Sequence, residues 1–297
     1  MDDHLYSELF LHLRQHLHPL PDKPEETPEN TLAALWCLAA GRPMSLEKAS
    51  SCELSNLNAE QQSLLRGFIK QRLSGTPLAH ITGRQQFMDF ELLAGPEALI
   101  PRKETEILGV ASLALIDEIV KSVDTPRIID VCTGAGNVAI AMGLHCTSGV
   151  IFASDLSAEA VALARRNVEM HNLSEQIQVL ESDLFASFKS KDFQNSIDLI
   201  TCNPPYISTA KVTKMDGEIS DYEPSLAFDG GPFGIKILYR VIKEAPLLLK
   251  KSGWLAFEVG AGQGDAMVKR LEKYSYSVIR TVPDERGEIR AILARTG

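Results

Sequence analysis

The chain has 297 residues, of which 44% are hydrophobic and 23% are charged, and its formal net charge is −9. This composition is typical of a soluble globular protein, and it excludes a disordered chain, a collagen-like repeat and a small disulfide-rich domain. No run approaches the roughly 18 apolar residues that a membrane span needs. The acidic N-terminus does not resemble a signal peptide, so we expect a cytoplasmic protein.

The acidic charge is spread along the chain. Residues 1–95 contain 8 Lys and Arg against 12 Asp and Glu, and the remainder contains 22 against 27. Neither part is a basic lobe, so we expect no direct binding to a nucleic-acid backbone. The five cysteines form no C-x-x-C pair. We therefore expect free thiols in a reducing compartment, and neither a zinc site nor a disulfide framework.

Residues 1–75 are expected to form a small all-α domain. Leucines recur at helical spacing between Leu5 and Leu13, and further helical patterns lie at 32–40 and 60–73. Turn signals at 18–21 and 41–43 separate these segments. Thr31 is placed where an N-cap would precede the second helix, and residues 45–48 are expected to open another short helix.

Residues 76–103 are interpreted as a connector, in which 87–92 has the pattern of a short strand or hairpin. From residue 104 onward, helical and strand-like segments alternate. Helices are expected at 104–120, 157–171 and 235–250, and strands at 127–131, 149–154, 176–180, 197–201, 254–258, 276–281 and 288–294. This alternation predicts an α/β domain over 104–297, with a mostly parallel sheet and helices on both faces. Ligands of such folds bind at the carboxyl ends of the strands.

A glycine-rich loop follows the first of these strands. Gly134 and Gly136 allow the backbone to approach a ligand closely. Together with Ala139 they also match the dinucleotide fingerprint G-x-G-x-x-A, so a nicotinamide enzyme is an alternative. Asp130 would repel a pyrophosphate but attract the ammonium group of S-adenosylmethionine (SAM), whose ribose diol suits Asp155. The loop alone leaves both cofactors open, as well as a tight turn that binds nothing.

The third strand is followed by Asp183 and Leu184, as expected of an adenine pocket. The carboxylate of Asp183 would accept from the exocyclic amine, and Leu184 would provide an apolar wall. An ordinary helix N-cap is the alternative role of Asp183.

The fourth strand ends in Asn203-Pro204-Pro205-Tyr206, the most specific motif of the chain. The prolines fix the backbone and remove two N–H donors. The side-chain carbonyl of Asn203 and the backbone carbonyl of Pro204 can then accept both hydrogens of one planar NH2 group, while Tyr206 packs on a flat substrate. Two fixed acceptors favour positive charge on a nitrogen that attacks a sulfonium methyl, and they repel a carboxylate. The motif therefore predicts methylation of an amide or ring-amine nitrogen.

With these residues identified, the chain resembles the HemK-type protein-(glutamine-N5) methyltransferases over nearly its whole length. The tetrapeptide alone is shared with DNA and RNA amino-methyltransferases, so the resemblance rests on its combination with other segments. These are the helical N-terminal domain, the glycine loop, Gly75-Thr76-Pro77, Ile81-Thr82-Gly83, Phe87, residues 100–106, Tyr222-Glu223-Pro224, residues 227–231, Glu258-Val259-Gly260, Asp284, Gly287 and Arg290.

The resemblance implies a class I SAM-dependent methyltransferase fold, which is Rossmann-like with a mostly parallel seven-stranded sheet. It implies transfer of a methyl group from SAM to the N5 amide of a glutamine in the Gly-Gly-Gln loop of peptide-chain release factors, leaving S-adenosyl-L-homocysteine. The helical domain is expected to recognise this protein substrate, and no metal is expected. The implied cofactor-binding residues are Asp130, Cys132, Thr133, Gly134, Ala135, Gly136, Asp155, Asp183, Leu184 and Asn203. The implied catalytic residues are Asn203, Pro204 and Tyr206, and Pro205, Arg102 and Glu106 join them in substrate binding.

Three positions depart from the family pattern. Cys132 stands where the release-factor branch usually has glycine, and it resembles the branch that modifies a ribosomal protein. His80 replaces the usual tyrosine, and Leu184 replaces a frequent tryptophan, which predicts a looser adenine wall. Conversely, Arg102 followed by Thr105-Glu106 resembles the release-factor branch. A ribosomal-protein substrate, a DNA or RNA amino-methyltransferase and a non-catalytic SAM- or nucleotide-binding module remain the alternatives.

Overall fold

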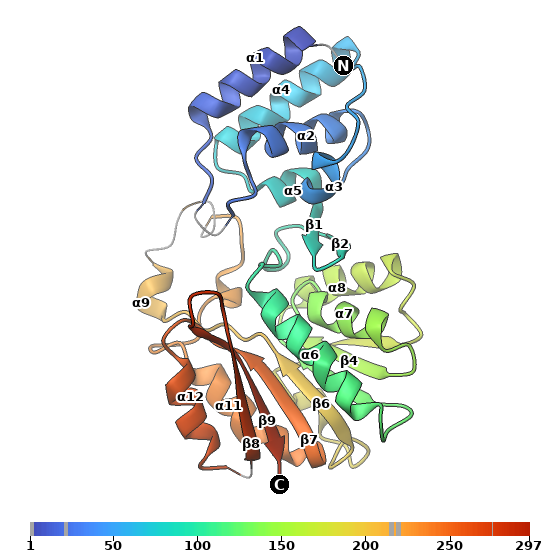
Figure 1. Ribbon diagram of the computed structural model, residues 1–297, viewed down its shortest axis with the longest axis vertical. Coiled ribbons are helices and arrows are strands. Elements are labelled where there is room, and N and C mark those ends of the chain that lie inside the picture. Colours follow the sequence, from blue (N-terminus) through green and yellow to red (C-terminus); the bar gives the residue numbers. More distant parts are fainter. Residues whose placement is uncertain (1–2, 21–22, 214–216, 218–220, 275) are drawn as a thin grey trace. The chain divides into compact units, whose positions relative to one another are not determined.

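The computed structural model describes residues 3–20, 23–213, 217, 221–274 and 276–297. The chain divides into two compact units (Figure 1). The first consists of Met1–Pro96 with Asp216–Glu223, and the second of Glu97–Met215 with Pro224–Gly297. In the described part of the chain, no helix has the length and apolar character of a membrane span.

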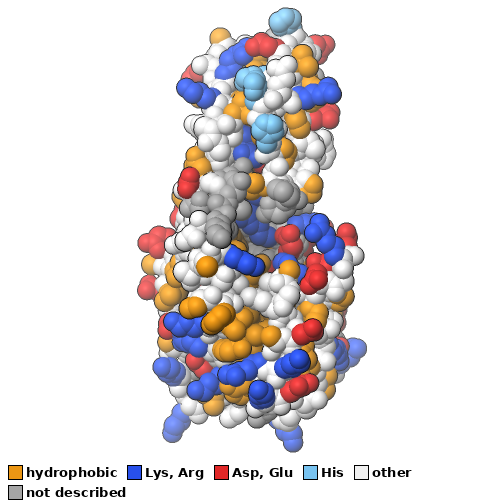
Figure 2. Space-filling model, turned by 90° about the vertical axis from the view of Figure 1, so that its left-hand side faces the viewer, with side chains coloured by type: hydrophobic (Ala, Val, Ile, Leu, Met, Phe, Trp, Pro, Cys, Tyr) orange, Lys and Arg blue, Asp and Glu red, His pale blue; other side chains and the backbone are white. Residues whose placement is uncertain are grey.

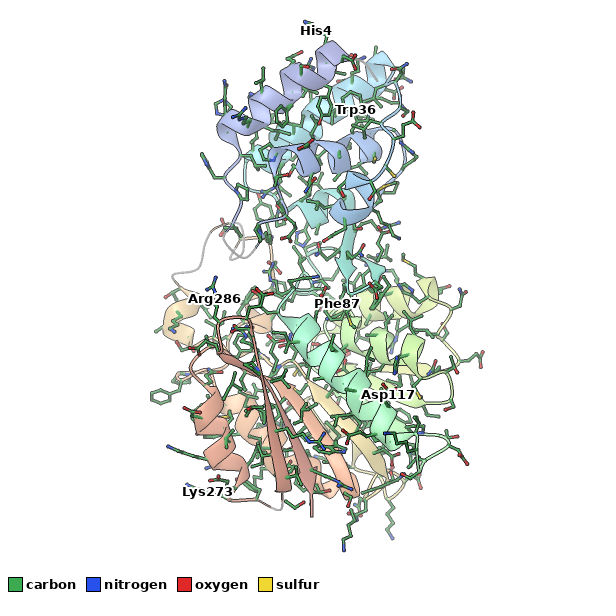
Figure 3. The ribbon with its side chains drawn as sticks, in the orientation of Figure 1. His4, Trp36, Phe87, Asp117, Lys273 and Arg286 are labelled. Carbon is green, nitrogen blue, oxygen red and sulfur yellow. The ribbon has the colours of Figure 1, made fainter. Side chains whose placement is uncertain are left out.

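The first unit is mainly helical, as predicted. Its helices are α1 (Asp3–His16), α2 (Pro28–Ala39), α3 (Leu46–Ser50), α4 (Ala59–Leu73) and α5 (Leu78–Thr82). The helices bury a leucine-rich cluster around Trp36, which is labelled in Figure 3. The Trp36 ring is fully buried, and its Nε1 donates to the Ser55 carbonyl at 2.8 Å. The indole therefore fills the core while its one polar atom is satisfied.

The predicted N-cap at Thr31 is wrong. Helix α2 begins at Pro28, and the side chain of Thr27 accepts from the Asn30 N–H at 3.2 Å. Proline suits the first turn of a helix because its missing N–H has no partner there, and Thr27 supplies the capping oxygen. Thr31 is consequently fully buried inside the helix.

A β-hairpin follows the helices and confirms the prediction at 87–92. Strands β1 (Arg84–Phe87) and β2 (Phe90–Leu93) pair antiparallel, and Met88 in the turn between them has a φ of 50°. The buried Glu91 carboxylate accepts from the Ser45 N–H at 2.7 Å. This bond attaches the hairpin to the start of α3, so the hairpin is part of the first unit.

The second unit is built on a seven-stranded sheet of order β5-β4-β3-β6-β7-β9-β8. All neighbours are parallel except at β9, which pairs antiparallel with both β7 and β8. The strands are β3 (Arg127–Val131), β4 (Val150–Asp155), β5 (Ile177–Glu181), β6 (Ile197–Cys202), β7 (Leu249–Glu258), β8 (Tyr276–Pro283) and β9 (Ile289–Thr296). The predicted, mostly parallel sheet is confirmed, and its order reverses between β3 and β6.

Helices cover this sheet. They are α6 (Thr105–Ile119), α7 (Asn137–His145), α8 (Ala158–Met170), the short α9 (Thr209–Val212), α11 (Lys236–Glu244) and α12 (Gly264–Leu271). Helix α6 packs on β6, β7 and β9, and Figure 1 shows it slanting in the same direction as β6 and β7. Helices α11 and α12 contribute Leu238, Val241 and Met267 to a separate apolar cluster with strand residues. Figure 3 labels Arg286 at the turn that joins β8 to β9.

The helix predicted at 235–250 is shorter than expected. Helix α11 ends at Glu244, a 3-10 turn covers Ala245–Leu247, and β7 already begins at Leu249. Pro246 is the physical reason, because it has no N–H to continue the helix and its ring crowds the preceding turn.

Candidate active site

The second unit contains a cavity of about 500 Å³ at the carboxyl ends of its parallel strands. The loops that follow β3, β4, β5 and β6 line it, together with residues that precede α6. Parallel strands bring these loops to one edge of the sheet, beside the position where the strand order reverses. The volume is that of a site for a small molecule.

The structure brings most of the predicted site residues to this cavity. The predicted residues that line it are Arg102, Asp130, Cys132, Thr133, Gly134, Ala135, Asp155, Asp183, Leu184, Asn203 and Pro205. Four predicted residues lie outside its lining, namely Glu106, Gly136, Pro204 and Tyr206. Glu106 instead forms an ion pair with Lys103 at 2.7 Å. His80 lies in α5, in the first unit.

The two loop glycines serve different purposes. Both have a positive φ, 54° at Gly134 and 86° at Gly136. A Cβ on Gly134 would meet no atom within 4 Å, so a side chain there would enter the open cavity. A Cβ on Gly136 would lie 3.4 Å from the Cβ of Ala164, so this glycine lets the loop pack closely on α8. Gly134 therefore leaves room for a ligand, and Gly136 supports the loop that binds it.

Asp130 is a buried carboxylate held by two hydroxyl groups. Its Oδ2 accepts from the hydroxyl of Thr133 and its Oδ1 from that of Thr201, both at 2.6 Å. Burial raises the pKa of Asp130 to about 6, although these two hydrogen bonds lower it. Thr201 is a buried residue of β6 that the sequence did not single out. The pair of threonines fixes the carboxylate at the floor of the cavity.

Asp155 ends β4 and binds the glycine loop. Its Oδ2 accepts from the Gly134 N–H at 2.9 Å and its Oδ1 from the Ser157 N–H at 3.1 Å. Burial raises the pKa of Asp155, while the hydrogen bonds from these N–H groups lower it. A carboxylate at this position retains lone pairs toward the cavity, as recognition of a diol requires.

Asp183 and Leu184 occupy the third strand end. Asp183 forms an ion pair with Arg240 of α11 at 2.7 Å, so only part of its carboxylate is engaged. Leu184 has a φ of 51° and is 5% exposed, and it lines the cavity. This backbone conformation turns the leucine side chain into the site, where it forms an apolar wall.

Asn203 lies directly after β6, with its side chain tied to the start of α6. Its Nδ2 donates to the Thr105 Oγ1 at 3.1 Å. The NH2 end of the amide is thus engaged, which leaves Oδ1 as the acceptor end. Pro204 is buried beside it, and Pro205 faces the cavity.

Tyr206 is fixed by groups that sequence reasoning did not assign. Its hydroxyl donates to Oε1 of Glu258 at 2.8 Å, and its backbone oxygen accepts from Nε2 of Gln263 at 2.9 Å. Glu258 ends β7 and is 1% exposed, and Arg290 Nη2 stands 4.0 Å from its Oε1. Burial raises the pKa of Tyr206, and the charge of Glu258 raises it further, so the phenol keeps its proton and donates. The signal for Glu258 was its place at a strand end of the catalytic sheet.

Cys132 adopts a φ of 58°, in the left-handed region that favours glycine. Burial raises the pKa of the Cys202 thiol well above its usual range, and the neighbouring Cys132 thiol raises it further. All five cysteines are free thiols. Within the described ranges, no three His, Cys, Asp or Glu side chains are grouped as metal ligands.

The chain is similar to known methyltransferases in sequence and in fold. Residues 105–218 match the methyltransferase small domain family. The release factor glutamine methyltransferase of Thermodesulfovibrio yellowstonii is 34% identical over 241 residues, which are 81% of this chain and 84% of the relative. The protein of the same name from Chlorobaculum tepidum is 34% identical over 77% of both chains, and that from Gloeobacter violaceus is 33% identical over 80% of both.

Solved structures share the fold. The N-terminal domain of human METTL16 superposes with a TM-score of 0.56 at 17% identity, over 94% of this chain and 97% of that one. The catalytic domain of hMettl16 gives a TM-score of 0.54 at 18% identity, over 68% of this chain and 74% of that one. At this level of identity the likeness concerns the methyltransferase fold alone.

Proposed function

The chain belongs to the release factor glutamine methyltransferase family, and we propose that it methylates the N5 amide of a glutamine in the Gly-Gly-Gln loop of release factors, using SAM. The observation that carries this proposal is the side chain of Asn203. It stands in the cavity with its NH2 end bonded to Thr105 and its carbonyl end left to accept from a substrate amide. The same cavity holds the glycine loop and the carboxylates suited to SAM.

The cavity fits the cofactor in size and in chemistry. A volume of about 500 Å³ suits a nucleoside of this kind, and Gly134 leaves open the space that a Cβ would fill. Asp130 and Gly134 would hold the methionine end, Asp155 the ribose, and Asp183 with Leu184 the adenine. Cys132, Thr133 and Ala135 would form the rest of the loop around the ligand. When bound, SAM supplies an electrophilic methyl group on a sulfonium centre.

The residues of the chain orient the substrate nitrogen. Oδ1 of Asn203 and the carbonyl of Pro204 accept both hydrogens of the glutamine NH2, so that its remaining electron pair points along one direction. Fixed acceptors also stabilise the positive charge that develops on nitrogen during attack, because they need not reorganise. The attacked nitrogen becomes acidic as the bond forms, so no strong base is required. Tyr206 lies outside the cavity lining, and its hydrogen bonds with Glu258 and Gln263 hold the tetrapeptide in place.

The same arrangement separates an amide from an acid. A glutamate carboxylate offers only acceptors, and two carbonyl acceptors would repel it. Arg102 lines the cavity, and we assign it to contacts with the backbone of the substrate loop. We assign substrate recognition outside the reacting amide to the helical first unit. On the face drawn in Figure 2, Lys and Arg side chains gather in the lower part around exposed hydrophobic side chains, and acidic side chains lie among them.

One experiment tests the substrate. The purified enzyme and labelled SAM are incubated with a cell extract that lacks this methyltransferase, and the labelled species is identified. A labelled release factor, with the methyl group on glutamine, is expected. A labelled ribosomal protein or nucleic acid would replace the proposal with one of its alternatives. A release factor substrate also places the enzyme in the cytoplasm, where free thiols such as the five found here persist.

A further inference from the structure

An aromatic ring stands in solvent on the loop that packs against the tetrapeptide 203–206. The side chain of Phe233 is 80% exposed, the largest exposed fraction among the large hydrophobic side chains that the structure describes. Single apolar side chains are common on protein surfaces, so exposure by itself does not mark a site. The backbone around this residue and its place beside the cavity distinguish it from an incidental surface residue.

The backbone on both sides of Phe233 is held by hydrogen bonds. The Gly230 N–H donates to the Ile207 carbonyl at 2.8 Å, which joins the loop to the residue after the tetrapeptide. The Gly234 N–H donates to the Gly231 carbonyl at 3.0 Å and closes the turn that contains Phe233. The ring is therefore presented from a fixed backbone, and a partner that binds it need not order the loop first.

Phe233 belongs to a segment that leaves the cavity wall and returns to it. Asp229, four residues before it, and Ile237, four residues after it, both line the cavity. Leu226 lines the cavity as well, and its side chain is 49% exposed. The carboxylate of Asp229 is engaged within the loop, where its Oδ1 accepts from the Gly231 N–H at 2.9 Å. Phe233 is therefore part of the rim, beside other apolar side chains.

This part of the rim adjoins the place where the substrate amide would react. The loop 230–234 packs on the carbonyl of Pro205, and Pro205 lines the cavity together with Asn203. A folded protein is much larger than a cavity of about 500 Å³, so most of it must stay outside and rest on the rim. A protein that inserts one glutamine beside Asn203 would thus come close to the exposed ring.

Positive charge accompanies the ring. Lys236 is exposed and begins α11, three residues after Phe233. Lys211 of α9 is exposed as well, and α9 is joined to the same loop because the Thr209 N–H donates to the Gly231 carbonyl at 3.1 Å. Figure 2 views the second unit from the side of α9, α11 and α12, where Lys and Arg side chains surround exposed hydrophobic ones. Such a surface is complementary to an apolar patch with acidic side chains.

We propose that Phe233 and Lys236 form a docking site for the folded protein substrate, in which the ring enters an apolar recess of the partner and the lysine faces an acidic side chain. The inference rests on the proposed function, and it adds a contact on the catalytic unit to the recognition assigned to the first unit. Aromatic side chains are typical anchors of protein interfaces. Because the site is remote from the reacting amide, it should affect the affinity for the folded partner alone.

The test uses the full chain with two substrates, an intact release factor and a short peptide that contains its Gly-Gly-Gln loop. Phe233→Ala removes the ring. Leu247→Ala is its matched control, since Leu247 is 67% exposed but lies two residues before β7 begins, at the edge of the sheet opposite the cavity. Lys236→Ala is compared with Lys243→Ala, which removes an exposed lysine from the last turn of the same helix. The measured quantities are KM, kcat, SAM affinity and melting temperature.

For Phe233→Ala we expect the KM for the release factor to rise about tenfold or more, as for an aromatic anchor. Its kcat for the release factor and its kcat/KM for the peptide should stay within about twofold of the wild type. Lys236→Ala should raise the KM for the release factor about threefold at low salt, and this effect should disappear at high salt because exposed charges are screened. Both controls should match the wild type, and SAM affinity should not change in any variant.

An unchanged KM for the release factor in Phe233→Ala would overturn the inference. Equal losses with the release factor and the peptide would overturn it too, because the loop would then act on the tetrapeptide and not on the folded partner. Weaker binding of a mixed-sequence RNA oligonucleotide by Phe233→Ala, with unchanged release factor kinetics, would assign the surface to nucleic acid instead. The proposed function fails separately, when the wild-type enzyme methylates neither the release factor nor the peptide.

Discussion

Gly234 and Tyr206 are in direct backbone contact: a Cβ placed on Gly234 would lie only 2.2 Å from the Tyr206 carbonyl oxygen. Gly230 stands in the same relation to Pro205, with 2.5 Å between its Cβ position and that carbonyl oxygen. The loop 230–234 therefore packs directly against the tetrapeptide 203–206, and only glycine permits this approach. Backbone atoms cannot move aside as a flexible side chain can.

Gly234→Ala should displace this loop or the tetrapeptide and lower kcat by about tenfold or more, since small misplacements of positioned groups are costly. Gly41→Ala is the matched control. Gly41 also has a positive φ, 79° against 69° at Gly234, but a Cβ there would meet nothing within 4 Å. In both variants the alanine is destabilised by about 1–2 kcal/mol because of its left-handed backbone conformation, and only Gly234→Ala also creates a steric clash. Equal kcat values in the two variants would contradict the role of the contact.

Asn203→Ala should lower turnover by about 100-fold or more, the typical cost of losing one preorganised hydrogen-bonding group. Its SAM affinity should change by no more than a few-fold, because the lost acceptor faces the substrate. Single-turnover kinetics and calorimetry measure the two quantities. More than about a tenth of the wild-type turnover would be incompatible with the orienting role.

Asp155→Ala should weaken SAM binding by about 1–3 kcal/mol, because it removes a charge-assisted acceptor and leaves the Gly134 N–H without its partner. The exposed Asp265, in the first turn of α12, provides a control for the loss of one negative charge. Calorimetry should find Asp265→Ala unchanged. Equal affinities for the two variants would remove Asp155 from the cofactor site.

Asp130 should make the protein less stable as the pH rises. Burial raises its pKa from 3.8 to about 6, so between these values the folded state binds more protons than the unfolded state. Its contribution to the free energy of unfolding therefore falls as the pH rises from about 4 to 6, and it stays low above that. Asp130→Asn removes this contribution. The difference in unfolding free energy, variant minus wild type, should increase across that range in denaturant titrations, and a constant difference would contradict the raised pKa.

Removal of the first unit should affect the protein substrate and spare the cofactor. A chain that begins after Pro96 lacks the helices and the hairpin but retains every residue named in the cavity. SAM affinity should stay close to that of the full-length protein. The value of kcat/KM for a folded release factor should fall much more than the value for a short Gly-Gly-Gln peptide, because remote contacts with the folded protein align the amide for attack. A folded truncated protein that methylates the release factor at the full-length rate would refute recognition by this unit.

The sequence alone determined the architecture of the second unit. Alternating apolar runs and helical patterns located all seven strands. For the central strands the reason is that burial on both faces needs a continuous apolar segment, and this requirement is local. The helix at 235–250 was overestimated because periodicity was read across Pro246, a local breaker. The cap at Thr31 was misplaced for a related reason, since Thr27, followed by Pro28, forms a competing start signal four residues earlier.

The sequence also identified Asn203 and the residues at the strand ends, because parallel strands necessarily gather their carboxyl ends at one edge. Only the tertiary structure decided what supports them. The supporting residues come from segments that are distant along the chain. Thr201 donates to Asp130, Glu258 accepts from the Tyr206 hydroxyl, and Gly234 packs against the Tyr206 carbonyl. Their roles depend on distances of about one hydrogen bond, and no periodicity in sequence encodes such distances. Local sequence motifs thus contain the residues that the chemistry needs, whereas the exact positions of these residues depend on packing between elements.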